Sequence, residues 1–372
     1  MAAIAEAQAA KGPVMALDAR WYTDPRVFEL EKTQIFARTW QFACHQSRLG
    51  KAGDFFSFKI GQTGLFLVRD RAGDIRCFHN VCRHRAHELV EGSGSRPFIV
   101  CPYHGWRYDL DGSLKSAPGE DRVPGFDRSC IRLREVRIEM FCGFVFVNLD
   151  DDAEPMAAWY PGAEEEMRAF LPGVDTLRPV AEIPVVEACN WKVSVENYSE
   201  CYHCKLRHPT FASGVIDPES YDVSPQGHCL RHTTRSAQSE KMTYAIDTPN
   251  PHAREYSSWF LWPTISFQVY PGSVLNTYLW RATDHRQVTV TRGWYTPEGV
   301  ASEQVDLLAQ QDLETTVAED ILIVESVQRG LESGSYEPGP LVIDPEGGVM
   351  SEHSIAAIYG WLQEALGEDL PS

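Results

Sequence analysis

Two short motifs in the first third of this chain combine cysteine with histidine. They are Cys82-x-His84 and Cys101-x-x-His104, and each contributes one thiol and one imidazole. Such a set can hold zinc or a [2Fe–2S] cluster. A zinc finger usually places its cysteine pair before its histidine pair, whereas the mixed order here suits a Rieske centre, in which two thiolates hold one iron and two imidazoles hold the other. The pattern therefore predicts a metal-bound electron carrier.

Residues around these motifs have lesser predicted roles. Pro102 and Gly105 are expected to turn the second loop, and Trp106 to shield the cluster. His79 and His87 lack ligand spacing, so we interpret them as surface residues or as neighbours of the ligands.

A second group of ligands follows in Glu200-x-x-His203-x-x-x-x-His208. Two histidines and one carboxylate form a facial arrangement that leaves positions on Fe(II) open for oxygen. Asp320 is the predicted carboxylate, because helical spacing places it on an apolar face where an unpaired charge would be costly. That face carries Val324, Val327 and Leu331, whereas the more polar faces carry Glu319 and Glu325.

Glu200 lies three residues before His203, so its carboxylate could accept the imidazole N–H and set the tautomer beside the iron site. The alternative is an ordinary solvated glutamate. Cys201 and Cys204 leave a zinc site open as a further reading, although no second thiol pair accompanies them.

The composition narrows the function classes. The net charge of −18 argues against nucleic-acid binding, which needs basic clusters, and the apolar runs are too short to span a membrane. The N-terminus lacks the features of a signal peptide, so we expect a cytoplasmic protein with reduced thiols. Buried structural thiols are the default for the cysteines without an assigned role, which are Cys44, Cys77, Cys130, Cys142, Cys189 and Cys229.

The chain is expected to have an α+β fold in three parts. Residues 1–39 form a helical segment that packs on the catalytic domain, residues 40–150 a small all-β [2Fe–2S] domain, and residues 151–372 a larger iron domain in which helices flank an antiparallel sheet. Short alternating runs between turn residues support the β domain. Strands are expected at 55–60, 65–68, 98–101, 144–147, 266–270, 274–280 and 288–295, and helices at 156–170 and 302–330. Ser302 is the expected N-cap and Gly330 the C′ residue of the last helix, which should break near Thr315 or Thr316.

The ligand motifs resemble those of Rieske non-haem iron oxygenase α subunits, and the resemblance covers essentially the whole chain. The branch that acts on quaternary ammonium compounds is most similar, which includes carnitine monooxygenase and the glycine betaine and proline betaine demethylases. The segments that carry this similarity are Asn190-Trp-Lys192, Glu196-Asn197, Glu200-Cys-Tyr-His-Cys204, His208-Pro209, Ile321–Leu331 and Ser351-Glu-His353. Ala86 departs from the family pattern, because many members have glycine there.

The resemblance implies a [2Fe–2S] cluster on Cys82, His84, Cys101 and His104 and a mononuclear Fe(II) on His203, His208 and Asp320. It implies that Glu200 bridges the two centres across a subunit interface in a homotrimer. O₂ would be the co-substrate, and electrons would come from NAD(P)H through a separate flavin and iron–sulfur reductase.

Nine aromatic residues crowd the catalytic half and permit a cage for a small cationic substrate, although aromatics on strands usually form core. They are Trp259, Phe260, Trp262, Phe267, Tyr270, Tyr278, Trp280, Trp294 and Tyr295. Our main hypothesis is a monooxygenase that hydroxylates an N-methyl group of a betaine and so releases formaldehyde. The alternatives are carnitine-type C–N cleavage to trimethylamine, aromatic-ring dihydroxylation, and a non-catalytic zinc or redox-sensor protein.

Overall fold

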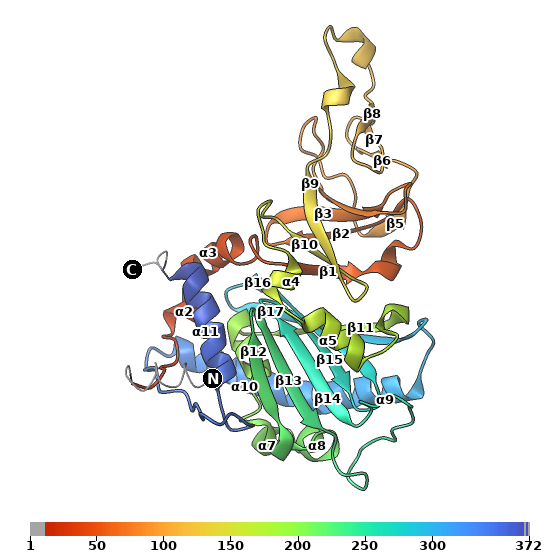
Figure 1. Cartoon of the computed structure of the whole chain (residues 1–372). Helices are drawn as coiled ribbons and strands as arrows, with labels where there is room; N and C mark the ends of the chain where they lie inside the picture. The colour runs from red at the N-terminus through yellow and green to blue at the C-terminus, as the bar shows by residue number, and fades with distance from the viewer. Residues whose placement is uncertain (1–11, 368–369, 371–372) are drawn as a thin grey trace. The chain divides into compact units, whose positions relative to one another are not determined.

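A computed structural model describes residues 12–367 and 370 of the chain. Residues 1–11 of the expected N-terminal helical segment lie outside this range. The chain divides into two compact units, one of Phe36–Glu154 and one that joins the described parts of Met1–Ile35 and Pro155–Ser372. Figure 1 shows the smaller unit built mainly of strands and the larger one built of a sheet with helices around it. None of the described helices is long and apolar enough to cross a membrane.

The smaller unit contains a seven-stranded sheet and a three-stranded sheet. The large sheet has the order β1-β10-β9-β4-β3-β2-β5 and the small sheet the order β6-β7-β8, and neighbouring strands in both sheets are antiparallel. The strand bounds are Gln41–His45 (β1), Asp54–Ile60 (β2), Thr63–Arg69 (β3), Ile75–His79 (β4), Ser93–Ser95 (β5), Ile99–Val100 (β6), Arg107–Tyr108 (β7), Leu114–Ser116 (β8), Glu135–Phe141 (β9) and Phe144–Asn148 (β10). The four strands expected in this region are confirmed.

The larger unit is built on a single antiparallel sheet of seven strands in the order β11-β17-β16-β15-β14-β13-β12. The strand bounds are Leu177–Glu187 (β11), Asp222–Gln226 (β12), Cys229–Arg235 (β13), Glu255–Leu261 (β14), Ile265–Tyr270 (β15), Val274–Asp284 (β16) and Gln287–Pro297 (β17). Strands β15, β16 and β17 contain the three strands that the sequence predicted here. Every position of β15 is buried, although Ser266 and Gln268 alternate with its apolar residues, and Gln268 is hydrogen-bonded to Tyr256 and Asn276.

Helices flank this sheet, and in Figure 1 α5 lies in front of it while α9 and α10 pass behind it. The helix bounds are Arg20–Thr23 (α2), Pro25–Gln34 (α3), Met156–Trp159 (α4), Ala163–Phe170 (α5), Trp191–Tyr198 (α6), Cys204–Arg207 (α7), Pro209–Gly214 (α8), Glu303–Asp312 (α9), Ala318–Glu332 (α10) and His353–Leu366 (α11). The α+β expectation is therefore confirmed. The helix expected at 156–170 is instead two helices, because Pro161 and a left-handed Gly162 separate them.

The helical span that begins after Ser302 largely follows the prediction. The Ser302 side chain caps the helix by accepting a hydrogen bond from the Val305 N–H, and a π-helical segment at Leu313–Val317 forms the expected break. The helix nevertheless continues to Glu332, so Gly330 is not its C′ residue. Glycine at that position keeps helical dihedrals because the following turn continues the backbone hydrogen bonds as far as Ser333.

Candidate metal centres

The two Cys/His loops of the smaller unit have the same backbone design. The Cys82 N–H donates to the His87 carbonyl at 2.9 Å, and the Cys101 N–H donates to the Trp106 carbonyl at 2.8 Å. Four residues after each cysteine, the N–H of Ala86 or Gly105 donates back to the cysteine carbonyl at 3.0 Å. Each loop is therefore a closed turn that holds its own Cys and His side by side.

Ala86 and Gly105 also share a left-handed backbone conformation, with φ of 59° and 72°. Glycine adopts this conformation without penalty, whereas an alanine Cβ costs about 1 kcal/mol or more. The departure from the family pattern at Ala86 thus changes the local energy but leaves the loop geometry intact.

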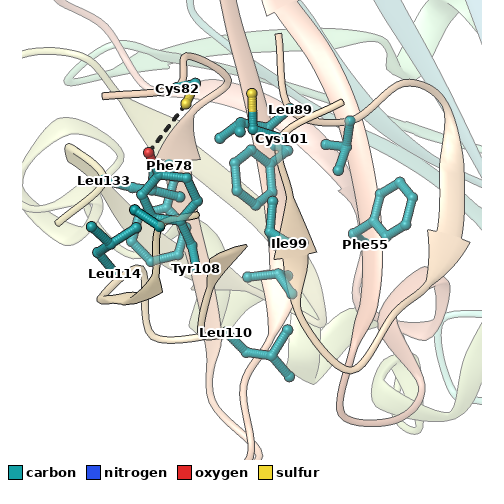
Figure 2. Packing of buried hydrophobic residues seen from close by; sticks show 14 residues of the cluster. Phe55, Phe78, Cys82, Leu89, Ile99, Cys101, Tyr108, Leu110, Leu114 and Leu133 are labelled. Atoms are coloured by element: carbon teal, nitrogen blue, oxygen red, sulfur yellow. Dashed lines mark hydrogen bonds between the residues drawn. The ribbon is translucent and has the colours of Figure 1, made fainter. Parts of the chain in front are cut away.

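The two cysteines lie at one edge of a hydrophobic cluster, as Figure 2 shows. Cys82 and Cys101 are each 2% exposed, and the Cys82 Sγ lies 3.2 Å from the Tyr108 hydroxyl. The imidazoles of His84 and His104 lie outside the cluster, with ring centroids 4.7 Å apart. This placement matches a cluster with a buried thiolate-bound iron and an outer imidazole-bound iron.

The side chains of these loops have the chemistry needed to bind a metal cluster. Both cysteines carry free thiols, and the buried Nδ1 of His104 has no hydrogen-bond partner among the described residues. Partial burial together with the neighbouring His84 and Arg85 lowers the pKa of His104, which favours the neutral imidazole that metals bind. Trp106 stacks on the His84 ring at 4.7 Å, in agreement with its expected shielding role. His79 on β4 is partly buried and His87 is exposed.

The second site brings together the three residues that the sequence proposed as iron ligands. His203 lies immediately before α7, His208 lies between α7 and α8, and Asp320 lies in the first turn of α10. One potential ligand atom from each lies within 4.8 Å of the others. The two Nε2 atoms are 3.0 Å apart, and the Asp320 Oδ1 lies 3.0 Å from the His208 Nε2. Such converging acceptors fit a metal ion.

A carboxylate contacts the outer nitrogen of each histidine. The His203 Nδ1 contacts the Glu200 Oε1, and the His208 Nδ1 lies 2.8 Å from the Glu319 Oε2. A carboxylate on Nδ1 holds the proton there, so the neutral ring presents Nε2 to a metal. Burial opposes protonation of His208, but Asp320 and Glu319 outweigh it and raise its pKa.

Glu319 is the site residue that sequence reasoning missed: it was assigned to a more polar helix face and given no role, whereas its carboxylate contacts the His208 Nδ1. On the same helix Val327 is 45% exposed, so the predicted apolar face is wrong at that position, although Val324 and Leu331 are buried. The buried residues of α10 are Val324, Gln328 and Leu331, so the inward face of the helix is centred nearer Gln328 than Val327. Glu325, also assigned to a polar face, accepts a hydrogen bond from the Ala188 N–H.

The cysteines of this region correct two expectations. Cys201 and Cys204 form a disulfide, so the alternative of a zinc site on them is wrong, as is the expectation that all thiols are reduced. Their Cα atoms are 4.9 Å apart because the turn before α7 folds them together around His203. Cys130 is exposed rather than buried, since it lies in a short surface 3₁₀ turn.

A pocket extends from His203, His208 and Asp320 between α6, α8 and the sheet. Only Tyr270 and Tyr278 of the nine candidate aromatics line it; the others are buried elsewhere or lie outside its wall. Aromatic residues that the sequence analysis did not single out complete the wall, and they are Tyr198, Phe211, Tyr221 and Tyr256. Their only sequence signal is position near the histidine motif or on a strand.

Comparisons with known proteins identify both units. Residues 39–127 match the Rieske [2Fe-2S] domain, and residues 174–368 match the catalytic domain of the ring hydroxylating alpha subunit. The chain belongs to this family of Rieske oxygenases. It is thus an oxidoreductase, and the cofactors of the family are a [2Fe–2S] cluster and a mononuclear non-haem iron. The match confirms the resemblance that the motifs indicated.

Individual relatives refine this assignment. The carnitine monooxygenase oxygenase subunit of Acinetobacter baumannii is 34% identical, over 90% of this chain and 91% of that protein. The glycine betaine monooxygenase oxygenase subunit of Chromohalobacter salexigens is 36% identical, but over only 54% of this chain and 45% of that protein. A solved quaternary ammonium Rieske monooxygenase, studied for carnitine oxidation and inter-subunit electron transfer, has a TM-score of 0.87 and 30% identity, covering 96% of this chain and 97% of that one.

Proposed function

We propose that this oxygenase acts on a quaternary ammonium substrate and is of the carnitine-cleaving type. The observation that carries the proposal is the chemistry of the pocket beside His203, His208 and Asp320. Its wall combines five tyrosines with the carboxylates of Glu200 and Asp320, and no lysine or arginine occurs among its described lining residues.

Such a wall favours a cation. An aromatic ring attracts a quaternary ammonium group by roughly 0.5–2 kcal/mol, and nearby carboxylates add to that attraction. An aromatic substrate without a cationic group would gain none of this attraction. This reasoning disfavours aromatic-ring dihydroxylation, and the second ligand set disfavours a sensor that would use only the cluster.

Each metal ligand has a proposed role. Cys82, His84, Cys101 and His104 would hold the [2Fe–2S] cluster, and His203, His208 and Asp320 would hold the mononuclear iron. When bound, these groups supply electron transfer and oxygen activation. Glu200 and Glu319 keep the Nδ1 protons in place, so that both imidazoles direct Nε2 inward.

The position of hydroxylation decides the product. Oxygen insertion at the backbone carbon next to nitrogen gives a carbinolamine that breaks its C–N bond to release trimethylamine and an aldehyde. Insertion at an N-methyl carbon releases formaldehyde instead. Each requires one O₂, two electrons and two protons, and forms one water. The carnitine relative is 34% identical over about nine tenths of both chains, whereas glycine betaine relatives match either about half of this chain or nine tenths of it at only 25% identity. The alternative is therefore better supported than our main hypothesis of N-demethylation.

The test is turnover by the iron-loaded protein with a generic flavin and iron–sulfur reductase. L-carnitine, glycine betaine, choline and benzoate are compared, with trimethylamine and formaldehyde measured together. We expect trimethylamine from L-carnitine, and none from a His203→Ala variant that retains the visible spectrum of the cluster. Formaldehyde as the sole product would establish demethylation, and oxidation of benzoate alone would reject the quaternary ammonium class.

We further propose that Glu200 connects the iron site to the cluster of a neighbouring subunit in a homotrimer. Its carboxylate contacts His203 and also accepts the Tyr202 N–H, so it is fixed at the edge of the site. The test co-expresses a cluster-deficient His104→Ala chain with an iron-deficient His203→Ala chain. Activity in the mixed oligomer requires transfer between subunits, because neither chain holds both centres. An inactive mixture with correct metal content would contradict the proposal.

A further inference from the structure

A buried group of charges lies behind the tyrosine wall of the pocket. It consists of Glu187, Arg292 and Asp312, which are 2%, 3% and 5% exposed. The Tyr278 hydroxyl donates to the Asp312 Oδ1 at 2.7 Å, and the Tyr270 hydroxyl contacts the same oxygen at 3.4 Å. Asp312 is thus the member of the group that touches the pocket wall.

The negative charge of this group is only partly compensated. Arg292 is the single cation beside two carboxylates, at 3.4 Å from Glu187 and 4.0 Å from Asp312. The Asp312 Oδ2, the Glu187 Oε2 and the Arg292 Nε have no hydrogen-bond partner among the described residues. With both carboxylates ionised the group carries one net negative charge in a poorly solvated position, where charges act over several ångströms.

Burial and the neighbouring groups have opposite effects on the pKa of Asp312. Burial raises its pKa, while the Arg292 charge and the Tyr278 hydroxyl oppose that rise. The net negative charge behind the wall would attract a cation on the pocket side and repel an anion.

The tyrosine hydroxyl groups of the wall are hydrogen-bonded to other protein groups. Besides the two that contact Asp312, Tyr256 donates to the Gln268 Oε1 at 2.7 Å and Tyr198 to the Ser258 Oγ at 3.0 Å. The Tyr221 hydroxyl lies 2.6 Å from the His232 Nδ1. Burial lowers the pKa of His232 to about 3, so this imidazole is neutral and its Nδ1 can accept a hydrogen bond from the Tyr221 hydroxyl.

The pocket therefore offers aromatic rings and oxygen lone pairs, but few free O–H donors. We infer that Asp312 is a specificity-determining residue. Its carboxylate accepts the Tyr270 and Tyr278 hydroxyl protons, which keeps them from pointing into the pocket, and it places negative charge behind the two rings. The site therefore selects a quaternary ammonium group over its neutral carbon analogue. This inference rests on the proposed quaternary ammonium substrate and assigns the selectivity to a residue outside the pocket lining.

The experiment measures binding rather than turnover. L-carnitine and its neutral-headed isostere, 3-hydroxy-5,5-dimethylhexanoate, are titrated calorimetrically into iron-loaded, anaerobic protein. The variant is Asp312→Asn, which keeps the shape of the side chain and one acceptor oxygen. We expect about a tenfold loss of affinity for L-carnitine, as for removal of one unit charge at several ångströms, with the isostere changed less than twofold.

Glu187→Gln is the matched control, because it removes a charge from the same group without a contact to a pocket tyrosine. We expect a smaller loss of cation selectivity than in Asp312→Asn. The specific role of Asp312 would be overturned if both variants lost the same amount of cation selectivity. It would also be overturned if Asp312→Asn weakened the affinity for L-carnitine and for the isostere equally.

Tyr278→Phe provides a second test if Asp312→Asn does not fold. Removing the donor to Asp312 is expected to weaken L-carnitine severalfold and leave the isostere unchanged; unchanged selectivity would overturn the inference. Failure of the proposed function and failure of the inference about Asp312 would give different results. A wild-type protein without preference for the cation contradicts the proposed function, whereas a wild-type preference that survives Asp312→Asn contradicts only the inference about Asp312.

Discussion

The ion pair between Glu31 on α3 and Lys192 on α6 should be among the most sensitive points of the larger unit. Their side chains are 0% and 1% exposed and in direct contact. The second oxygen of Glu31 accepts the Trp191 Nε1–H at 2.7 Å. Because both charges are removed from water, each is stabilised mainly by its attraction to the other.

Replacing only one partner leaves the other charge buried and unpaired, which costs about 3–5 kcal/mol. Glu31→Leu also removes the oxygen that accepts the Trp191 Nε1–H, which adds roughly 1 kcal/mol. The double variant Glu31→Leu/Lys192→Met removes both charges and replaces them with apolar side chains. We expect it to be more stable than either single variant, since buried pairs can often be replaced by apolar residues at little cost.

Urea unfolding followed by tryptophan fluorescence and far-UV circular dichroism measures the three variants. The reasoning predicts a coupling energy of several kcal/mol between the two positions. The exposed pair Lys205–Glu219 is the control, because solvent-exposed pairs contribute only about 0–1 kcal/mol. Single variants that cost less than about 1 kcal/mol, or a double variant whose cost equals the sum of the singles, would refute the account.

Three further predictions concern the two centres and the packing around them. Glu319→Gln should weaken iron binding about 10–100-fold by loosening His208, measured by anaerobic iron titration, whereas a matched Glu325→Gln should leave affinity unchanged. Burial raises the pKa of Glu196 from 4.5 to about 7, although Tyr22 and Lys192 oppose this. The carboxyl of Glu196 therefore binds its proton more tightly in the folded state than in the unfolded state, and the wild-type protein loses stability as this group ionises with rising pH. The free energy of unfolding of Glu196→Gln, measured in urea relative to wild type, should rise by roughly 2.5 kcal/mol between pH 5 and 8. A difference in stability that does not change with pH would contradict this prediction. Ala86→Gly should stabilise the first cluster loop by about 0.5–1 kcal/mol because it removes the left-handed alanine, and slower loss of cluster absorbance in urea would show it.

Local spacing in the sequence was sufficient for the ligand motifs and for most elements. Cysteine and histidine two or three residues apart lie on one turn whatever surrounds them, so the pairs in both cluster loops were predictable. Strand alternation predicted β15 to β17, and Ser302 marked the start of α9 through the capping preference of its hydroxyl. The iron histidines likewise lie close together because the short α7 turn separates them.

Tertiary structure decided what depends on residues far apart in the chain. Glu319 reaches His208, and Asp312 reaches Tyr278, only because α9 and α10 pack beside the sheet and the π-helical segment between them changes the helical phase. A helical count within α10 placed Asp320 beside the histidines, but packing centres the buried face on Val324, Gln328 and Leu331 and leaves Val327 exposed, and it also brings Glu319 to His208. The pocket wall was equally hidden, because which aromatic side chains face a cavity is set by strand register and helix packing rather than by the residues' types.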